Sequence, residues 1–321
     1  MKKGLIFGLM FLVVLAFSTP AKAILIVNDW TLDLSAVNPN LEIVNDISQI
    51  GFYGVAHIEI VDDVDNSGTA TVGDIGITDT HLAATSLVNT GGSLITTTGL
   101  NNSWHPNPWE MTFDLTDAAV FTSMSGTALT YSHIAPGTYG FETADGILDI
   151  YIDTTLDANT GTGDGYTGGT STLIAQLLIH TGPAGVFTPT TFDGSVDATF
   201  TALWVMQNVF LDSSGNDLST MPGLVMMAIT DSNFDGDPDN QLYFSHMEPT
   251  NWGTYFPTRL AGGDDLTIPP NGYADNSHPM AFYALEDGSA KIGVIPEPAT
   301  MLLLGSGLLG LGFFGRKRTK K

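Results

Sequence analysis

The chain of 321 residues contains no cysteine. It therefore has no disulfide, no thiolate metal site and no cysteine nucleophile, and it lacks the lipid-bearing cysteine of bacterial lipoproteins. Lysine and arginine are also scarce, with 10 of them against 34 aspartates and glutamates. Such an anionic chain repels nucleic acid and anionic lipid, and metal cations are the partners that its charge favours.

Familiar catalytic motifs are missing as well. The seven histidines are never four residues apart, and no His-Glu-x-x-His sequence occurs. No Gly-x-Ser-x-Gly motif precedes a helix pattern, and the glycine loops that bind phosphates or dinucleotides are absent. Carboxylate pairs suited to glycoside hydrolysis carry no information among so many acids. We therefore expect that the protein is not an enzyme, with an extracellular glycan-cleaving enzyme as the least favoured alternative.

The beginning of the chain has the pattern of a secretory signal peptide. Lys2 and Lys3 precede an apolar stretch over residues 5–17, and the small-residue site Ala21-Lys22-Ala23 follows it. This order of basic, apolar and small residues predicts a signal peptide over residues 1–23 and cleavage before Ile24. The protein is then exported across the inner membrane.

The end of the chain combines a short motif, an apolar run and a basic cluster. Pro296-Glu297-Pro298 is followed by the apolar residues 299–315, which form a membrane-spanning helix of about 25 Å at 1.5 Å per residue. Five of the six residues after this run are basic, which favours a cytoplasmic end and an exported preceding domain. A plain C-terminal membrane anchor without processing is the alternative interpretation.

With this tail, residues 295–321, the chain resembles the PEP-CTERM class of exported bacterial proteins. The resemblance implies a membrane-anchored precursor that is processed by an exosortase and then reaches the cell surface or the extracellular matrix. It also implies an association with exopolysaccharide and with biofilm. Because it covers only the tail, it leaves the activity of residues 24–294 open.

The exported part is predicted to be an all-β domain. Residues 24–298 contain all 34 acids but only Arg259 and Lys291 as cations, so their formal charge is 2 minus 34, or −32. Apolar and polar residues alternate over residues 55–61 and 148–152, as in half-buried strands. Further short β-prone runs, separated by Gly, Asp, Asn or Pro, occupy residues 94–98, 109–115, 129–134, 173–179, 199–205, 224–229, 241–244 and 280–285. We expect one β-sandwich or jelly-roll domain over residues 24–294.

Two of the runs are more continuously apolar than the others. Residues 173–179 and 200–206 suit strands that are covered on both faces, although each could instead form a short helix. Residues 157–172 are low in complexity and rich in glycine, which predicts a mobile loop or a linker.

Two acidic segments have the oxygen spacing of calcium loops. Calcium takes six to eight oxygen ligands, and a loop with oxygen side chains at every second position and glycine at position six supplies them. The first segment is similar to EF-hand and dockerin loops, and the second to thrombospondin type-3 loops, although its position twelve is leucine. The alternative for both is an ordinary turn without an ion. The proposed ligands are Asp63, Asp65, Ser67, Thr69, Thr71 and Asp74 in the first loop, and Asp231, Asn233, Asp235, Asp237 and Asp239 in the second.

Aromatic residues suggest a further role. Trp104 and Trp109 lie in a polar, proline-containing segment and are candidates for an exposed sugar-stacking pair, although aromatic residues more often pack in a core. We therefore weigh two non-enzymatic functions. The first is a calcium-binding structural protein of the surface or matrix, associated with acidic exopolysaccharide. The second is a calcium-dependent carbohydrate-binding module.

Overall fold

The structure, a computed structural model, describes residues 24–62, 70–135, 146–156, 171–188, 193–233 and 280–295. About two thirds of these residues form strands. Two short 3₁₀ helices, η1 (Leu34–Ala36) and η3 (Leu218–Thr220), begin after Asp33 and Asp217, whose side chains accept hydrogen bonds from the following backbone. The strands are β1 (Leu25–Ile26), β2 (Trp30–Asp33), β3 (Ile43–Asp62), β4 (Ile75–Asn89), β5 (Glu110–Ser125), β6 (Ala128–His133), β7 (Ile147–Asp153), β8 (Thr172–Ile179), β9 (Gly182–Thr188), β10 (Asp193–Val205), β11 (Phe210–Asp212), β12 (Leu224–Asn233) and β13 (Met280–Val294).

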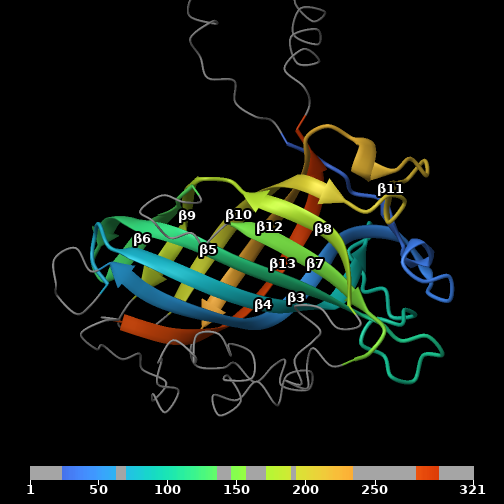
Figure 1. Cartoon of the computed structure of the whole chain (residues 1–321), viewed down its shortest axis with the longest axis horizontal. Coiled ribbons are helices and arrows are strands. Elements are labelled where there is room, and N and C mark those ends of the chain that lie inside the picture. Colours follow the sequence, from blue (N-terminus) through green and yellow to red (C-terminus); the bar gives the residue numbers. More distant parts are fainter. Residues whose placement is uncertain are drawn as a thin grey trace, which may run out of the picture.

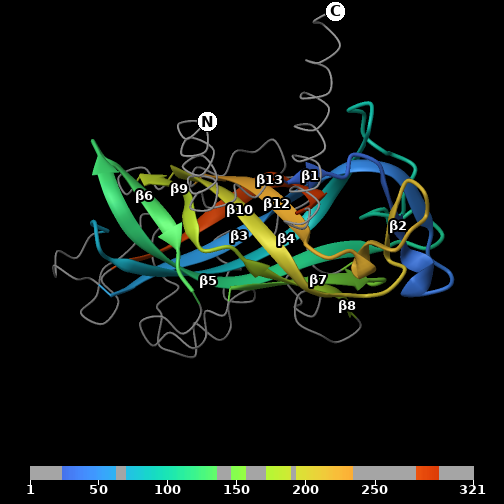
Figure 2. The same cartoon turned by 90° about the horizontal axis from the view of Figure 1, so that it is seen from above.

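The strands form one antiparallel sheet that closes on itself (Figures 1 and 2). The closure occurs at β3, which pairs with β4 along one edge and with β13 along the other. Both β6 and β7 pair with β5, and together they occupy the place of one interrupted strand. In the same way, β8 and β9 both pair with β10 and form a second interrupted strand. The closed sheet therefore runs β3, β4, β5, β6 with β7, β8 with β9, β10, β12 and β13 in chain order.

The all-β prediction is confirmed, but the prediction of a sandwich or jelly roll is wrong. Those folds have two sheets, whereas all the strands here belong to one. The error has a physical reason: alternation of apolar and polar residues marks a strand with one buried face, and a closed sheet produces the same alternation as a sandwich. The order of the strands depends on pairing between distant residues, which a single sequence does not reveal.

Most of the predicted strands are present. Eight of the ten runs coincide with parts of β3, β5, β6, β7, β8, β10, β12 and β13, and the two continuously apolar runs are strands rather than helices. Residues 94–98 form no strand, and residues 241–244 lie outside the described residues. The prediction that residues 200–206 are covered on both faces is wrong, because Leu203 and Trp204 are exposed at an irregularity in the pairing of β10 with β8.

The structure does not describe the two ends of the chain. The predicted signal peptide of residues 1–23 and the apolar run of residues 299–315 lie outside the described residues, as does most of the glycine-rich segment 157–172. Within the described part of the chain, no helix is long and apolar enough to cross a membrane.

The main hydrophobic core fills one end of the closed sheet. Inward side chains of the long strands pack there together with β2 and β11, whose Trp30 and Phe210 rings lie 5.8 Å apart. Glu42 connects this end to the segment before β5. Its Oε1 accepts hydrogen bonds from Trp109 Nε1 at 2.6 Å and from the Gly99 backbone N–H at 2.5 Å.

Removal of the Glu42 carboxylate is expected to destabilise this end. Glu42→Ala leaves the buried Trp109 Nε1 without its acceptor, which should lower the free energy of unfolding by about 1–3 kcal/mol. Glu42→Gln keeps a carbonyl oxygen and should lose less. Urea denaturation of both variants measures the difference, and equal losses would show that the hydrogen bonds to Oε1 contribute nothing.

Candidate functional site

A cavity lies inside the closed sheet, beside the main core. Its volume is about 130 Å³. Alternate residues of each strand point inward, and many of those that line the cavity are small: Gly76 in β4, Gly194 and Ala198 in β10, and Ala228 in β12. The cavity therefore exists because glycine and alanine occupy positions where larger side chains would fill the interior.

One side of the cavity is apolar. Phe52, Phe113, Phe200, Leu82 and Met226 line it, and all five are buried. The rings of Phe52 and Phe113 have their centroids 5.9 Å apart and are tilted by 55°. These side chains also belong to the main core, so this wall is held by the packing that stabilises the fold.

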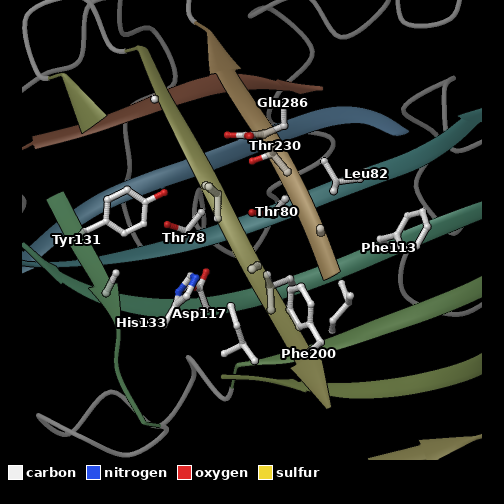
Figure 3. A pocket seen from close by; sticks show the side chains of 18 of the residues that line it. Thr78, Thr80, Leu82, Phe113, Asp117, Tyr131, His133, Phe200, Thr230 and Glu286 are labelled. Carbon is white, nitrogen blue, oxygen red and sulfur yellow. The ribbon is translucent and has the colours of Figure 1, made fainter. Parts of the chain in front are cut away.

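Polar side chains gather on the other side (Figure 3). We call this group the polar belt and define it as Thr78 (β4), Asp117 (β5), Tyr131 and His133 (β6), Thr230 (β12) and Glu286 (β13). Figure 3 shows Glu286 beside Thr230 and His133 beside Asp117, while Phe113 and Phe200 lie toward the apolar side. The belt is far from exposed, since Asp117, His133 and Glu286 are only 5–6% exposed.

The best-defined contact in the belt joins His133 to Asp117. His133 Nδ1 lies 2.5 Å from Asp117 Oδ2. A carboxylate accepts hydrogen bonds, so the proton of this contact belongs to Nδ1, and in the neutral imidazole Nε2 is then an acceptor. Nε2 is buried and has no hydrogen-bond partner among the described residues, and the same holds for the hydroxyl oxygen of Thr230.

Tyr131 closes the belt toward β6 and β9. Its hydroxyl donates a hydrogen bond to the Ser195 backbone oxygen at 3.3 Å, and its ring packs edge-on against Phe121 and His133. Burial raises the pKa of Tyr131 well above its usual value, and the nearby carboxylates of Glu286, Asp117 and Asp197 raise it further. The raised pKa is consistent with a negative electrostatic potential in this part of the interior.

Gly185 of β9 makes room for this tyrosine. It lies opposite Tyr131 of β6 and Val196 of β10. A Cβ atom at this position would overlap the backbone oxygen of Ser195 and lie 2.8 Å from the Tyr131 hydroxyl.

We expect Gly185→Ala to lower the free energy of unfolding by about 1–3 kcal/mol, because backbone or ring must move to admit the methyl group. Gly91→Ala is the matched control, since a Cβ there meets only the Asn89 Oδ1 atom at 3.3 Å. Thermal unfolding compares the two. A Gly185→Ala protein as stable as the control would contradict the close packing.

The two tryptophans proposed for sugar stacking differ. Trp104 is 94% exposed, whereas Trp109 is fully buried in the main core and donates its N–H to Glu42. The prediction that both are exposed is therefore wrong for Trp109. The polar, proline-containing sequence around them indicates a loop, but it does not show that the last residue of that loop turns inward at the start of β5. A stacking pair of Trp104 with Trp109 is not formed.

The first acidic loop is described only at its end. Asp74 is buried, and its Oδ2 accepts hydrogen bonds from the backbone N–H of Thr71 at 2.7 Å and from its hydroxyl at 3.0 Å. These bonds are those of an acid that fixes a tight turn before β4. The other proposed ligands of this loop, Asp63, Asp65, Ser67 and Thr69, lie outside the described residues.

The second acidic loop is shorter than predicted. Asp231 and Asn233 belong to β12, where they pair with Asp287 and Leu285 of β13. The remaining proposed ligands, Asp235, Asp237 and Asp239, lie outside the described residues. Among the residues that the structure describes, no three His, Asp or Glu side chains are grouped so that they could hold a metal ion.

The polar belt was not predicted from the sequence. Asp117, His133 and Glu286 are widely separated in the sequence and come together only because β5 pairs with β6 and the sheet closes through β13. The sequence did contain one local indication of the belt. Asp117 and Glu286 are acids at strand positions that point inward, where apolar residues are expected. The pairing register that brings them together depends on distant strands and is not encoded in a local sequence pattern.

Comparison with known proteins identifies only the tail. Residues 294–318 match the PEP-CTERM protein-sorting motif. The chain therefore carries the sorting signal of an exported, membrane-anchored precursor that an exosortase recognises and processes for surface display. Neither the curated proteins nor the solved structures contain a match to the chain. The motif Pro296-Glu297-Pro298 lies outside the described residues.

Proposed function

We propose that the exported domain is a non-enzymatic binding protein that holds one small ligand inside the closed sheet. The observation that carries this proposal is the cavity inside the closed sheet, where His133 Nε2 and Thr230 Oγ1 have no hydrogen-bond partner among the residues that the structure describes. A buried polar atom that forms no hydrogen bond costs about 1–3 kcal/mol. A ligand with one polar end and an apolar body would satisfy both atoms and cover the ring surfaces opposite them.

The size of the cavity limits the ligand. A cavity of roughly 150 Å³ takes up a benzene-sized molecule, so about 130 Å³ suits one ring or a short alkyl chain. Inward side chains from all the long strands surround the cavity. The closed sheet therefore suits a ligand that is held inside it better than one that is bound on its outer surface. A larger glycan would not fit, and for this reason we favour a small ligand over the carbohydrate-binding alternative.

The test is a binding survey with the full-length chain purified in a non-ionic detergent. Single-ring neutral, cationic and anionic compounds are titrated by calorimetry. At least one should bind, and Ala198→Leu, which fills the cavity from β10, should abolish that binding. Thr199→Leu is the matched control, because the neighbouring residue points to the opposite face of the same strand. If no compound binds to the wild-type chain, the proposal is wrong.

The sorting signal supports a destination for this binding protein. We propose that the processed protein is retained at the cell surface or in an extracellular matrix, in contact with acidic exopolysaccharide. One support is the sorting motif at residues 294–318. The other is the −32 charge of residues 24–298, because a domain this anionic repels an acidic polymer unless cations lie between them. A matrix role would be contradicted if a strain that lacks the gene kept its matrix and flocculated normally.

Calcium is the cation that we propose for the acidic loops. The support is the spacing of Asp63, Asp65 and Ser67. An ion that binds only the folded state raises the melting temperature, so millimolar calcium should raise it relative to excess chelator, and Asp63→Ala should reduce that rise. Asp29→Ala, which removes an exposed acid just before β2, is the control. Equal melting temperatures with calcium and with chelator would reduce the loops to ordinary turns.

A further inference from the structure

The first and last strands of the sheet lie side by side. Leu25 of β1 pairs with Val294 of β13, and Figure 2 shows β1 beside the end of β13. The backbone N–H of Ile295 donates a hydrogen bond to the Gly223 oxygen at 2.8 Å, so the sheet holds the chain up to this residue. We call Ile295 the exit point. The predicted signal peptide before β1 and the sorting signal at the end of β13 therefore join the closed sheet at the same place.

The exit point lies close to the membrane in the anchored precursor. The sorting motif covers residues 294–318, and its apolar run begins at residue 299. Only residues 296–298 separate Ile295 from this run, and four Cα–Cα steps extend at most about 14 Å. The headgroup layer on each side of a bilayer is itself roughly 5–7 Å thick. The exit point is therefore held less than about 10 Å above the headgroups.

Exposed apolar side chains lie around the exit point. We call Leu25, Leu203 and Trp204 the exit patch, and their exposed fractions are 65%, 55% and 44%. Leu25 belongs to β1, and the other two lie near the end of β10, at the irregularity in its pairing with β8. Single exposed apolar side chains are ordinary on a protein surface. This group differs because it lies beside the attachment of a membrane anchor.

The strand register places the β10 part of the exit patch. Thr201 of β10 lies opposite Val225 of β12, which lies opposite Gly293 of β13. Leu203 and Ile295 each follow two residues beyond this row, in the same direction. Two strand spacings amount to about 10 Å. The exit patch is therefore as close to the membrane anchor as the width of two strands allows.

The chemistry of this surface matches the headgroup region of a bilayer. Tryptophan favours that region because its indole has an apolar body and one N–H donor. Lys291 is the only lysine or arginine among the described residues, and it is exposed on β13 four residues before Ile295. A lysine can keep its apolar stem against a membrane surface while its ammonium group stays at the level of the lipid phosphates.

We propose that the exit patch contacts the lipid surface while the sorting signal still anchors the chain. The closed sheet then stands on the membrane on the side of β1 and the ends of β10 and β13. Three apolar side chains bind lipid weakly by themselves, but the anchor keeps them at a high effective concentration beside it. The contact is therefore lost when processing releases the domain. This inference concerns the outer surface of the precursor and does not depend on a ligand in the cavity.

The experiment uses the absence of cysteine from the chain. Leu203→Cys in the full-length chain is labelled with the environment-sensitive dye NBD and inserted into phosphatidylcholine vesicles, which carry no net charge. Flotation with the vesicles shows that the chain is anchored. Lipid with brominated acyl chains should then quench the dye at residue 203 several-fold more than the dye of the control variant.

The matched control is Met124→Cys with the same label. Met124 is also exposed and apolar, but it lies beyond Val120, which is level with Ile75 of β4 and with Asp62 of β3. That level is the beginning of β13, whose 15 residues span about 50 Å. The control therefore reports the end of the closed sheet that lies away from the exit point.

A second measurement needs no label. Brominated lipid should quench part of the tryptophan emission of the anchored wild-type chain, and Trp204→Phe should reduce this quenching. It tests the inference even if a cysteine variant fails to fold. Equal quenching at residues 203 and 124 would overturn the proposal, as would quenching that Trp204→Phe leaves unchanged. A dye at residue 203 that stays in water in the anchored chain would show that the exit patch does not contact lipid.

Discussion

Replacement of His133 by leucine is expected to lower the free energy of unfolding by about 3–5 kcal/mol. The substitution removes the hydrogen bond from Nδ1 and leaves the Asp117 carboxylate buried without its partner. Breaking one half of a buried pair is costly because the remaining charge keeps its desolvation penalty after the compensating contact is lost. Chemical denaturation of the purified variant measures the loss.

A double-mutant cycle identifies the cause of this loss. Asp117→Leu combined with His133→Leu removes both polar groups, so the double variant should lose less than the sum of the two single variants. Asp117→Asn keeps an oxygen acceptor for Nδ1 and should lose less than Asp117→Leu. Additive losses in the cycle would show that the two side chains act independently and that their 2.5 Å contact does not stabilise the fold.

The sequence predicted the strands better than their arrangement. Residues 148–152 and 173–179 were predicted as strands because their apolar residues follow a local pattern, and they lie in β7 and β8. The closure of the sheet was not predicted, because it depends on pairing between β3 and β13, which are separated by most of the chain. A local pattern records which face of a strand is buried, but it contains no information about the partner on each edge.

The candidate site was beyond prediction for a similar reason. Trp104 and Trp109 were considered together because they are close in the sequence, yet one is exposed and the other is fully buried. Tyr131 and Glu286 are distant in the sequence, yet both line the cavity. The cavity also depends on inward glycines and alanines. A sequence does not show that such small residues leave a space, because this depends on which residues face them once the strands are paired. By contrast, the sorting motif in the tail was predicted correctly because a sorting signal is read as a linear sequence.

The stability of the protein is expected to fall between pH 6.5 and pH 4 through one histidine outside the cavity. His81 of β4 has a side chain that is only 11% exposed, and burial lowers its pKa from 6.5 to about 4, although the carboxylate of Asp79 acts in the opposite direction. Asp114 of β5 also faces it, with Oδ1 at 3.2 Å from His81 Nδ1. The folded state therefore resists protonation of this ring.

The sign of the effect follows from the two pKa values. Above pH 6.5 the ring is neutral in the folded and unfolded states, so its contribution is fully present. As the pH falls toward 4, the unfolded state binds a proton that the folded state does not, and about 3 kcal/mol of stability is lost. Carboxylates titrate in the same range, so the quantity to measure is the difference between the wild-type chain and His81→Gln in urea denaturation at pH 7 and pH 4.5. The variant should lose less stability on acidification, and equal losses would show that His81 takes up its proton as readily in the folded state as in the unfolded chain.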